Sequence, residues 1–141
     1  GQTGRYGMVI PRFVGSALAG SPITIYGTGK QTRAFCHVED IVEALVKLIN
    51  CRKAYGEVVN LGSTEVISIN GLAKKVKSIT KSKSSVVYIA YKDAFNETFE
   101  DMLSRVPDIS KARKLIGYKP KHNLDEILVS VAEYHKKNNN V

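Results

Sequence analysis

The sequence predicts an α/β fold, and two observations lead to this prediction. Segments whose apolar residues recur at the helical period alternate with short segments rich in β-branched and aromatic residues. The chain has 141 residues, 43% of them hydrophobic, which is enough to bury one core. We therefore expect a single compact unit without repeats or low-complexity segments.

A helix of about three turns is expected near the start, with Pro11 in its first turn and Gly20 at its end. Its apolar residues follow the helical period at Val9, Phe13 and Ala17. A β-hairpin is expected next, with arms Ile23–Tyr26 and Arg33–Val38. Glycines at positions 27 and 29 would supply the permissive backbone that this reversal needs.

A second helix is expected over Val38–Asn50, followed by a strand over Glu57–Leu61. The apolar residues of the helix recur at Ile41, Leu45, Leu48 and Ile49. Glu39 and Asp40 fall in its first turn, at the positive end of the helix dipole.

Two capped helices and one strand are expected further along. Ser68 can cap a helix whose apolar face consists of Leu72, Val76 and Ile79. Val86–Ile89 has the residue types of a strand. Asn123 and Glu126 have the spacing of a capping box, ahead of a helix with Leu124, Ile127, Leu128 and Val131.

The stretch from Arg105 to Arg113 gives the first functional signal. Asp108 is expected to be the N-cap of a helix that ends at Gly117, with Pro107 just before it. The apolar face of this helix consists of Ile109, Ala112, Leu115 and Ile116. Arg105 would then lie on a loop, where its planar guanidinium suits a diphosphate. By itself the pattern favours an ordinary surface arginine before a capped helix.

Further motifs surround that arginine in a fixed order. They are Met8-Val-Ile-Pro-Arg-Phe13, Ile23-Thr-Ile-Tyr-Gly-Thr-Gly-Lys-Gln-Thr-Arg-Ala-Phe35, Val38-Glu-Asp-Ile41, Val59-Asn-Leu-Gly62 and Gly117-Tyr-Lys-Pro120. Over nearly its whole length the sequence resembles the NAD-dependent epimerase/dehydratase family, the extended short-chain dehydrogenases that act on nucleotide sugars. A UDP-glucose 4-epimerase-like enzyme is the member we expect. UDP-glucuronate decarboxylase and dTDP-glucose 4,6-dehydratase types stay open, as does the choice of uridine or thymidine.

The resemblance implies that residues 1–141 are the C-terminal, nucleotide-sugar-binding portion of a Rossmann-type enzyme. Residues 34–61 would pack on the dinucleotide-binding sheet, and the other segments would build a small mixed α/β substrate domain. NAD would be bound mainly by the N-terminal portion. The helix over Val38–Asn50 would expose an apolar face, so we expect that portion as a partner and a homodimer of the isolated chain.

Three segments resemble the dinucleotide fingerprint or the catalytic Tyr-x-x-x-Lys motif of this family, but none of them is a credible match. Gly1–Gly7 has the glycine spacing of a dinucleotide fingerprint, but no strand precedes it in this sequence. Tyr26–Lys30 and Tyr88–Lys92 match Tyr-x-x-x-Lys, but the first contains turn glycines and the second continues a strand. We therefore expect no catalytic residue in this chain and no turnover by the chain alone.

The resemblance also implies which residues contact the nucleotide sugar. They are Val9, Ile10, Thr24, Tyr26, Arg33, Asn60, Arg105 and Asp108. The first four would lie near the base, although helix core and cross-strand packing explain them equally well. The two arginines would converge on the diphosphate. Arg33-Ala34-Phe35 departs from the common Arg-Asp/Ser-Phe/Tyr pattern, which affects the expected specificity.

The formal net charge of +8 raises the alternative of a non-catalytic basic binding module, including one for nucleic acid. Basic residues cluster at Lys74, Lys75, Lys77, Lys81 and Lys83, and again at Lys111, Arg113, Lys114, Lys119 and Lys121. These clusters interleave with apolar helix positions and lack an aromatic stacking platform. The pattern therefore favours solvated helix faces, and nucleic acid is not the expected partner.

Cys36 and Cys51 have no paired spacing, and the histidines His37, His122 and His135 complete no metal-binding motif. We expect reduced thiols and no metal site. The sequence contains no apolar run long enough for a membrane span or a signal peptide, so a soluble, cytoplasmic protein is expected.

Overall fold

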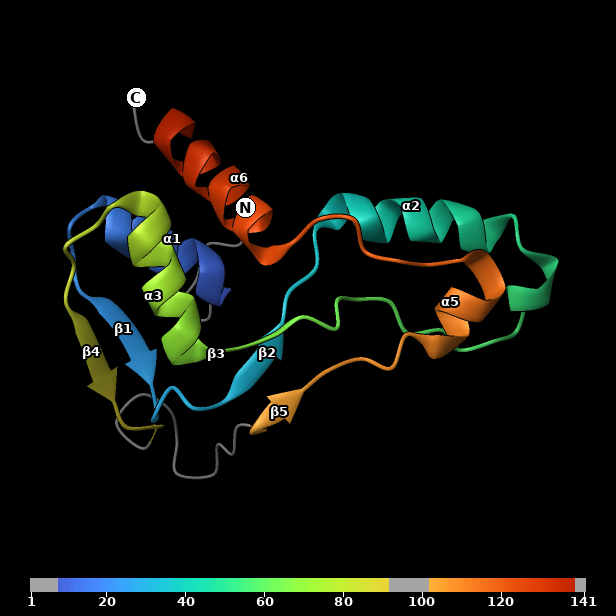
Figure 1. Ribbon diagram of the computed structural model, residues 1–141, viewed down its shortest axis with the longest axis horizontal. Helices are drawn as coiled ribbons and strands as arrows, with labels where there is room; N and C mark the ends of the chain where they lie inside the picture. The colour runs from blue at the N-terminus through green and yellow to red at the C-terminus, as the bar shows by residue number, and fades with distance from the viewer. Residues whose placement is uncertain (1–7, 92–101, 139–141) are drawn as a thin grey trace.

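The computed structural model describes residues 8–91 and 102–138, and the predicted α/β fold class is confirmed. The elements in order are α1 (Val9–Leu18), β1 (Ile23–Tyr26), β2 (Thr32–Ala34), α2 (Val38–Ile49), the short 3-10 helix η1 (Arg52–Ala54), β3 (Val66–Ser68), α3 (Ile69–Thr80), β4 (Val86–Ile89), β5 (Ser104–Arg105), α5 (Ser110–Ile116) and α6 (Leu124–Asn138). Two lobes lie side by side and are linked by the sheet that contains β2 (Figure 1).

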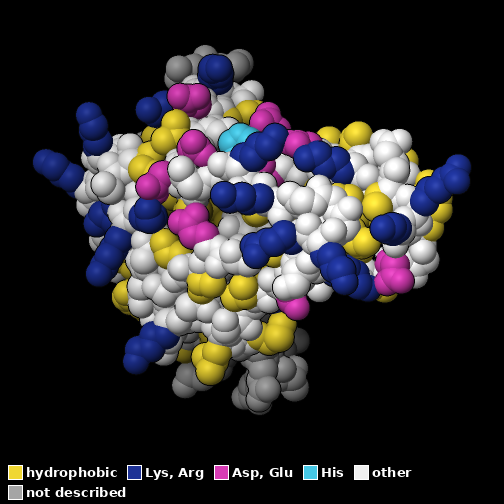
Figure 2. All heavy atoms as spheres, turned by 45° about the vertical axis from the view of Figure 1, so that its right-hand side comes forward, with side chains coloured by type: hydrophobic (Ala, Val, Ile, Leu, Met, Phe, Trp, Pro, Cys, Tyr) yellow, Lys and Arg dark blue, Asp and Glu magenta, His cyan; other side chains and the backbone are white. Residues whose placement is uncertain are grey.

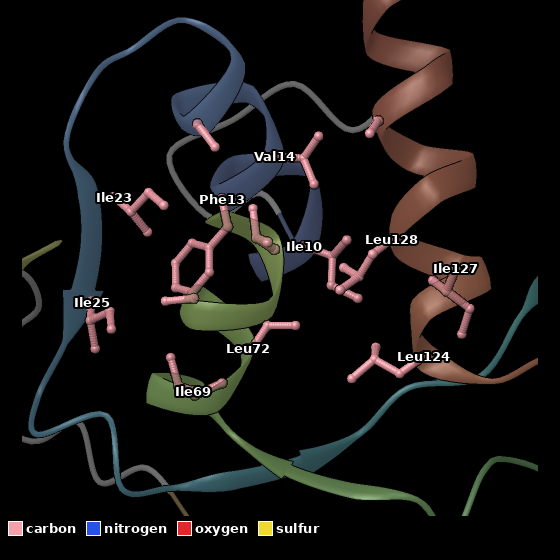
Figure 3. Packing of buried hydrophobic residues seen from close by; sticks show 14 residues of the cluster. Ile10, Phe13, Val14, Ile23, Ile25, Ile69, Leu72, Leu124, Ile127 and Leu128 are labelled. Atoms are coloured by element: carbon pink, nitrogen blue, oxygen red, sulfur yellow. The ribbon is translucent and has the colours of Figure 1, made fainter. Parts of the chain in front are cut away.

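The first lobe consists of α1, α3 and α6 together with the parallel pair β1–β4. Its core takes residues from each helix and from β1: Ile10, Phe13, Val14, Ala17, Ile23, Ile25, Ile69, Leu72, Ala73, Val76, Leu124, Ile127, Leu128 and Ala132. Figure 3 shows Phe13 directed toward Ile23 and Ile25 of β1, and Leu72 directed toward Leu124 and Leu128 of α6. The lobe therefore has a hydrophobic core of its own.

Local signals placed the helix ends of this lobe correctly. The Ser68 hydroxyl accepts a hydrogen bond from the Gly71 backbone N–H at 3.0 Å, which confirms the cap of α3. The capping box of α6 is also confirmed. The Asn123 side chain accepts from the Glu126 N–H at 3.0 Å, and the Glu126 carboxylate accepts from the Asn123 N–H at 2.8 Å.

The expected hairpin between Ile23–Tyr26 and Arg33–Val38 is wrong. β1 pairs with β4, whereas β2 lies in a separate three-stranded sheet of order β3-β2-β5. The segment between β1 and β2 is bound to the start of α3. The carbonyls of Gly29 and Gln31 accept hydrogen bonds from the first N–H groups of that helix. The turn glycines at 27 and 29 have positive φ, as expected, but they lead the chain out of the first sheet.

Two other boundaries differ from the expectation. The second hairpin arm ends at Ala34, because the His37 side chain caps α2 by accepting from the Glu39 N–H at 3.3 Å. The expected strand over Glu57–Leu61 is also wrong, because within the described residues this segment pairs with no strand. An extended segment forms ladder hydrogen bonds only where a neighbouring strand is available.

The second lobe packs α2 against α5 around the buried residues Ala44, Ile109, Ala112 and Tyr118. Asp108 is not the N-cap of α5. The helix begins at Ser110 with Ile109 at the cap position, and the Asp108 carboxylate accepts from the Ser110 N–H at 2.9 Å. Gly117 ends the helix with φ +63°, as expected.

The predicted helix over Val38–Asn50 is confirmed as α2, and its outer face is apolar and exposed. This face consists of Val38, Val42, Leu45 and Ile49. Val38 and Ile49, at its two ends, keep 67% and 70% of their surface accessible. Within the described ranges, every helix is too short or too polar to cross a membrane.

Candidate functional site

One pocket lies in the first lobe, where α1, β1 and the start of α3 meet β2. It is lined by Val9, Arg12, Phe13, Thr24, Ile25, Tyr26, Gln31, Arg33, Ile69 and Tyr91. The pocket thus brings together the expected residues Val9, Thr24, Tyr26 and Arg33 from three elements that are separate in sequence.

Arg12 and Tyr26 form one wall of this pocket. The guanidinium carbon of Arg12 lies 4.7 Å from the centre of the Tyr26 ring, a cation–π contact. The Nη2 atom of Arg12 also donates to the Thr24 carbonyl at 3.2 Å. Because the cation–π contact and the hydrogen bond act on one planar group, they hold the guanidinium at the pocket wall.

Gln31 and Tyr91 form a second wall. The nearly buried Gln31 amide donates to the Tyr26 carbonyl at 3.0 Å and contacts the Tyr91 hydroxyl at 2.9 Å. The Tyr91 ring lies directly over Gly27, where a Cβ atom would overlap it. Gly27 also has φ +70°, so both the backbone conformation and the close ring call for glycine there.

Arg33 and Arg105 occupy paired positions on the neighbouring parallel strands β2 and β5. Side chains at paired positions project from the same face of a sheet, so both guanidinium groups start from one face at adjacent sites. The Nη1 atom of Arg33 donates to the carbonyls of Thr32 and Met102, at 2.6 and 2.8 Å. Two cations placed opposite each other repel, and an anion between them relieves the repulsion.

The other expected site residues lie outside the pocket lining. Ile10 is 6% exposed and belongs to the core of the first lobe. Asn60 is exposed in the extended segment beside the second lobe, so its amide needs no buried partner. Asp108 is exposed and shapes the turn before α5. Arg105 lies in β5, whereas we had expected it on a loop.

Sequence reasoning missed Arg12, Gln31 and Tyr91. Arg12 carried a usable signal, because a cation in the first turn of a helix lies at the positive end of the dipole, where it is unfavourable. Gln31 and Tyr91 carried none, since their contact joins two positions that are far apart in sequence.

A second polar cluster links the two lobes. The nearly buried Asp40 carboxylate at the start of α2 accepts from the backbone N–H groups of Lys121 and His122 at 3.1 and 3.2 Å. It also contacts His122 Nδ1 at 3.1 Å. Burial alone would raise the pKa of Asp40, but these hydrogen bonds outweigh burial and hold the pKa below its ordinary value.

His37, Glu39 and His122 gather beside Asp40, within reach of one another. The two imidazole rings stack with centres 4.3 Å apart and an interplanar angle of 29°. Nitrogen lone pairs lie in the ring plane, so those of nearly parallel rings do not converge on one ion. Both Nδ1 atoms also make hydrogen bonds already. We interpret the group as a structural link between α2 and the segment before α6.

Cys36 and Tyr118 are poor candidates for chemistry. Both cysteines are free thiols. Burial raises the pKa of the Cys36 thiol, and it also raises the pKa of the Tyr118 phenol, which lies 3.4 Å from that sulfur. The Tyr118 hydroxyl donates to the Gly62 carbonyl at 3.2 Å. Neither side chain therefore offers a nucleophile or base at neutral pH.

On the face shown in Figure 2, acidic side chains lie among the lysines and arginines toward the top and left, while several basic side chains gather at the centre and right. Members of both basic clusters make ion pairs. Lys75 pairs with Asp125 at 2.5 Å, Lys111 with Glu57 at 2.7 Å and Lys121 with Glu43 at 2.5 Å. This arrangement supports solvated helix faces over a phosphate-binding footprint.

The described residues do not fit a dinucleotide. β3 continues directly into α3, with the Ser68 side chain as cap, and no glycine-rich turn separates them. A dinucleotide pyrophosphate requires close approach to such a turn at a helix N-terminus. The described residues therefore supply no turn for the pyrophosphate of NAD.

A sequence profile of the family described as GDP-mannose 4,6 dehydratase matches residues 3–131. The chain belongs to this family of NAD-dependent epimerases and dehydratases. It is 33% identical over 133 residues to the UDP-N-acetyl-alpha-D-glucosaminuronate decarboxylase of Bacillus cytotoxicus, covering 94% of this chain and 41% of that protein. It is 38% identical over 128 residues to UDP-glucuronic acid decarboxylase 1 of Danio rerio, covering 91% and 29%.

A similar solved structure is that of UDP-glucuronic acid 4-epimerase from Bacillus cereus in complex with UDP-glucuronic acid and NAD. The TM-score is 0.81 at 27% identity, over 92% of this chain and 40% of that one. The chain spans less than half the length of these relatives and corresponds to their C-terminal portion. The expected family and its Rossmann-type fold are thereby confirmed.

Proposed function

We propose that this chain binds the UDP group of a UDP-sugar and is the substrate-binding portion of an NAD-dependent nucleotide-sugar enzyme. The observation that carries the proposal is the pairing of Arg33 with Arg105 on adjacent strands. Two arginines at paired strand positions match the two phosphates of a nucleoside diphosphate, because each guanidinium can bind phosphate in a forked, charge-assisted contact.

The remaining pocket residues suit the nucleoside. Tyr26 supplies an aromatic ring, Val9 an apolar contact, and Thr24 lies beside them on β1. The pocket therefore combines an aromatic wall with a cationic side chain, Arg33, as a base attached to phosphates requires. Asn60, Ile10 and Asp108 contribute to the surrounding structure in this arrangement.

For the reaction, the relatives favour decarboxylation of a UDP-uronate. The two curated relatives at 33% and 38% identity are both named decarboxylases of such sugars. The expected UDP-glucose 4-epimerase activity is the second candidate, because a UDP-glucuronic acid 4-epimerase has the same fold over 92% of this chain. In either reaction this chain would position the nucleotide end of the substrate.

The outer face of α2 is the surface on which we expect a partner. The exposed apolar face of α2 fits the N-terminal dinucleotide-binding portion that the longer relatives contain, because such a face is stabilised when another surface covers it. A second copy of this chain in a homodimer is the competing occupant.

The test is calorimetric titration of UDP into the chain and into Arg33→Ala, Arg105→Ala and double variants. Each single substitution should weaken binding about tenfold, since a charge-assisted contact contributes roughly 1.5–3 kcal/mol. The double variant should lose less than the sum, because both arginines address one group. Arg113→Ala, an exposed arginine on α5, is the matched control.

Unchanged affinity in Arg105→Ala, in a variant whose circular dichroism shows it folded, would refute the diphosphate site. Absence of UDP binding together with salt-sensitive binding to duplex DNA would instead favour the non-catalytic basic module.

A further inference from the structure

Arg12 holds an unusual position for a basic residue. It lies in the first turn of α1, where the helix dipole disfavours a cation, and that turn contains no acidic residue. Its side chain is only partly exposed. The guanidinium is held against Tyr26 and Thr24 at the wall of the pocket.

The contacts of the Arg12 guanidinium limit the kind of ligand group that it can bind. The N–H groups of a guanidinium lie in one plane, and the group has donors only. The Thr24 carbonyl uses one of these donors. The preferred partner is therefore a hydrogen-bond acceptor in that plane, such as the carbonyl oxygen of a planar base.

Resting on the proposed UDP site, we propose that Arg12 is the residue that selects the base. Uracil has carbonyl oxygens on its ring and can accept from Arg12. Adenine has no carbonyl oxygen: its acceptors are ring nitrogens, and its exocyclic amino group is a donor, so a donor held at the position of a uracil carbonyl oxygen is not matched by adenine in the same way. Tyr26 and Thr24 hold the guanidinium in place.

A role on the phosphates is the competing explanation, and the two roles make different predictions for substitutions. A phosphate contact depends mainly on positive charge, so lysine would preserve part of it. A planar donor held opposite a carbonyl oxygen cannot be replaced by an ammonium group on a flexible stem. Loss of such a hydrogen bond affects only the nucleotide that makes it.

The experiment compares UDP and ADP affinity, by calorimetry, for the chain, Arg12→Met, Arg12→Lys and the control Arg113→Met. We expect Arg12→Met to weaken UDP binding about tenfold and to change ADP binding less than twofold, so that the preference for UDP falls about tenfold. Arg12→Lys should behave like Arg12→Met. Arg113→Met should behave like the unaltered chain.

Equal losses for UDP and ADP, or rescue by Arg12→Lys, would overturn the base-selecting role and assign Arg12 to the phosphates. Unchanged affinities in Arg12→Met would overturn any role in the site. Circular dichroism of each variant excludes unfolding as the cause. If the proposed UDP site itself is wrong, the unaltered chain will not bind UDP, and this result differs from each of the outcomes above.

Discussion

The two lobes bury apolar surface in different ways. The first lobe encloses Phe13, Ile23, Leu72 and Leu128 almost completely, from three helices and a strand. The second lobe encloses a small set around Ala44 on one side of α2, while the larger aliphatic side chains of that helix face outward. The first lobe is therefore stabilised by its own core, whereas the second depends on whatever covers the outer face of α2.

This difference originates in the sequences of the helices. In α1 the buried residues occupy one stripe, as in a helix at the surface of a core. In α2, Ala44 is turned toward α5, and Val38, Val42, Leu45 and Ile49 form a second apolar stripe. A helix that is apolar on both sides is normally buried between two layers. Among the described residues, only one of these layers is present.

The largest expected change in the free energy of unfolding comes from replacing one leucine in each lobe by alanine. Leu72→Ala removes a fully buried side chain and should lower the free energy of unfolding by about 2–5 kcal/mol. Leu45→Ala removes a side chain that is 48% exposed and should cost less than about 1 kcal/mol in the isolated chain. Urea unfolding followed by circular dichroism measures both.

A comparable loss in both variants would contradict this contrast, because it would mean that Leu45 is covered in solution. Light scattering of the unaltered chain would then show the predicted homodimer. A monomer with a tolerant Leu45 leaves the α2 face available for the N-terminal portion of a longer enzyme.

The second effect concerns the link between the lobes. Asp40→Ala leaves two backbone N–H groups and the His122 ring without their acceptor and should cost about 2–3 kcal/mol. Asp40→Asn keeps one acceptor oxygen and should lose less. Chemical unfolding at pH 7 measures these differences.

The same link has a pH dependence of defined sign. The pKa of Asp40 is lower in the folded chain than in the unfolded chain. The ionised carboxylate therefore contributes its full stabilisation above the unfolded-state pKa of about 4, and this stabilisation is lost as the pH falls through the folded-state pKa. Between pH 6 and pH 3 the unaltered chain should lose more stability than Asp40→Asn. Parallel pH profiles for the two would contradict a stabilising carboxylate at this position.

The sequence predicted helices better than strand pairing, for a physical reason. Caps and apolar spacing act within a few residues, so Ser68, Asn123 and the stripe of α1 could be identified locally. Pairing of β1 with β4 joins segments far apart in sequence, and no local pattern distinguishes it from a hairpin. The segment Glu57–Leu61 has strand-like residues but no neighbouring strand within the described part of the chain.

The same limit applies to the candidate site. Motifs in a fixed order identified Tyr26 and Arg33, and the structure brings them into one pocket. The contacts that hold that pocket together were not predictable, because Gln31 meets Tyr91 and Arg12 meets Tyr26 only after the chain has folded. The register that places Arg33 beside Arg105 is likewise a product of strand pairing.

The smallest expected effect compares the caps of one helix in each lobe. Asn123→Ala removes one half of the reciprocal capping box of α6, a helix that supplies Leu124 and Leu128 to the main core. It should lower the free energy of unfolding by about 1 kcal/mol, and Asn123→Asp, which keeps the acceptor oxygen, should restore it.

Asp108→Ala removes a single exposed hydrogen bond to the Ser110 N–H before the short helix α5, and we expect a smaller loss than for Asn123→Ala. The helix α5 packs in the second lobe, where the outer face of α2 is uncovered. Weakening α5 should therefore change the free energy of global unfolding less than weakening α6 does. Thermal unfolding of both alanine variants in parallel measures the contrast. A larger loss for Asp108→Ala than for Asn123→Ala would show that the second lobe unfolds together with the first and is not the weaker part of the molecule.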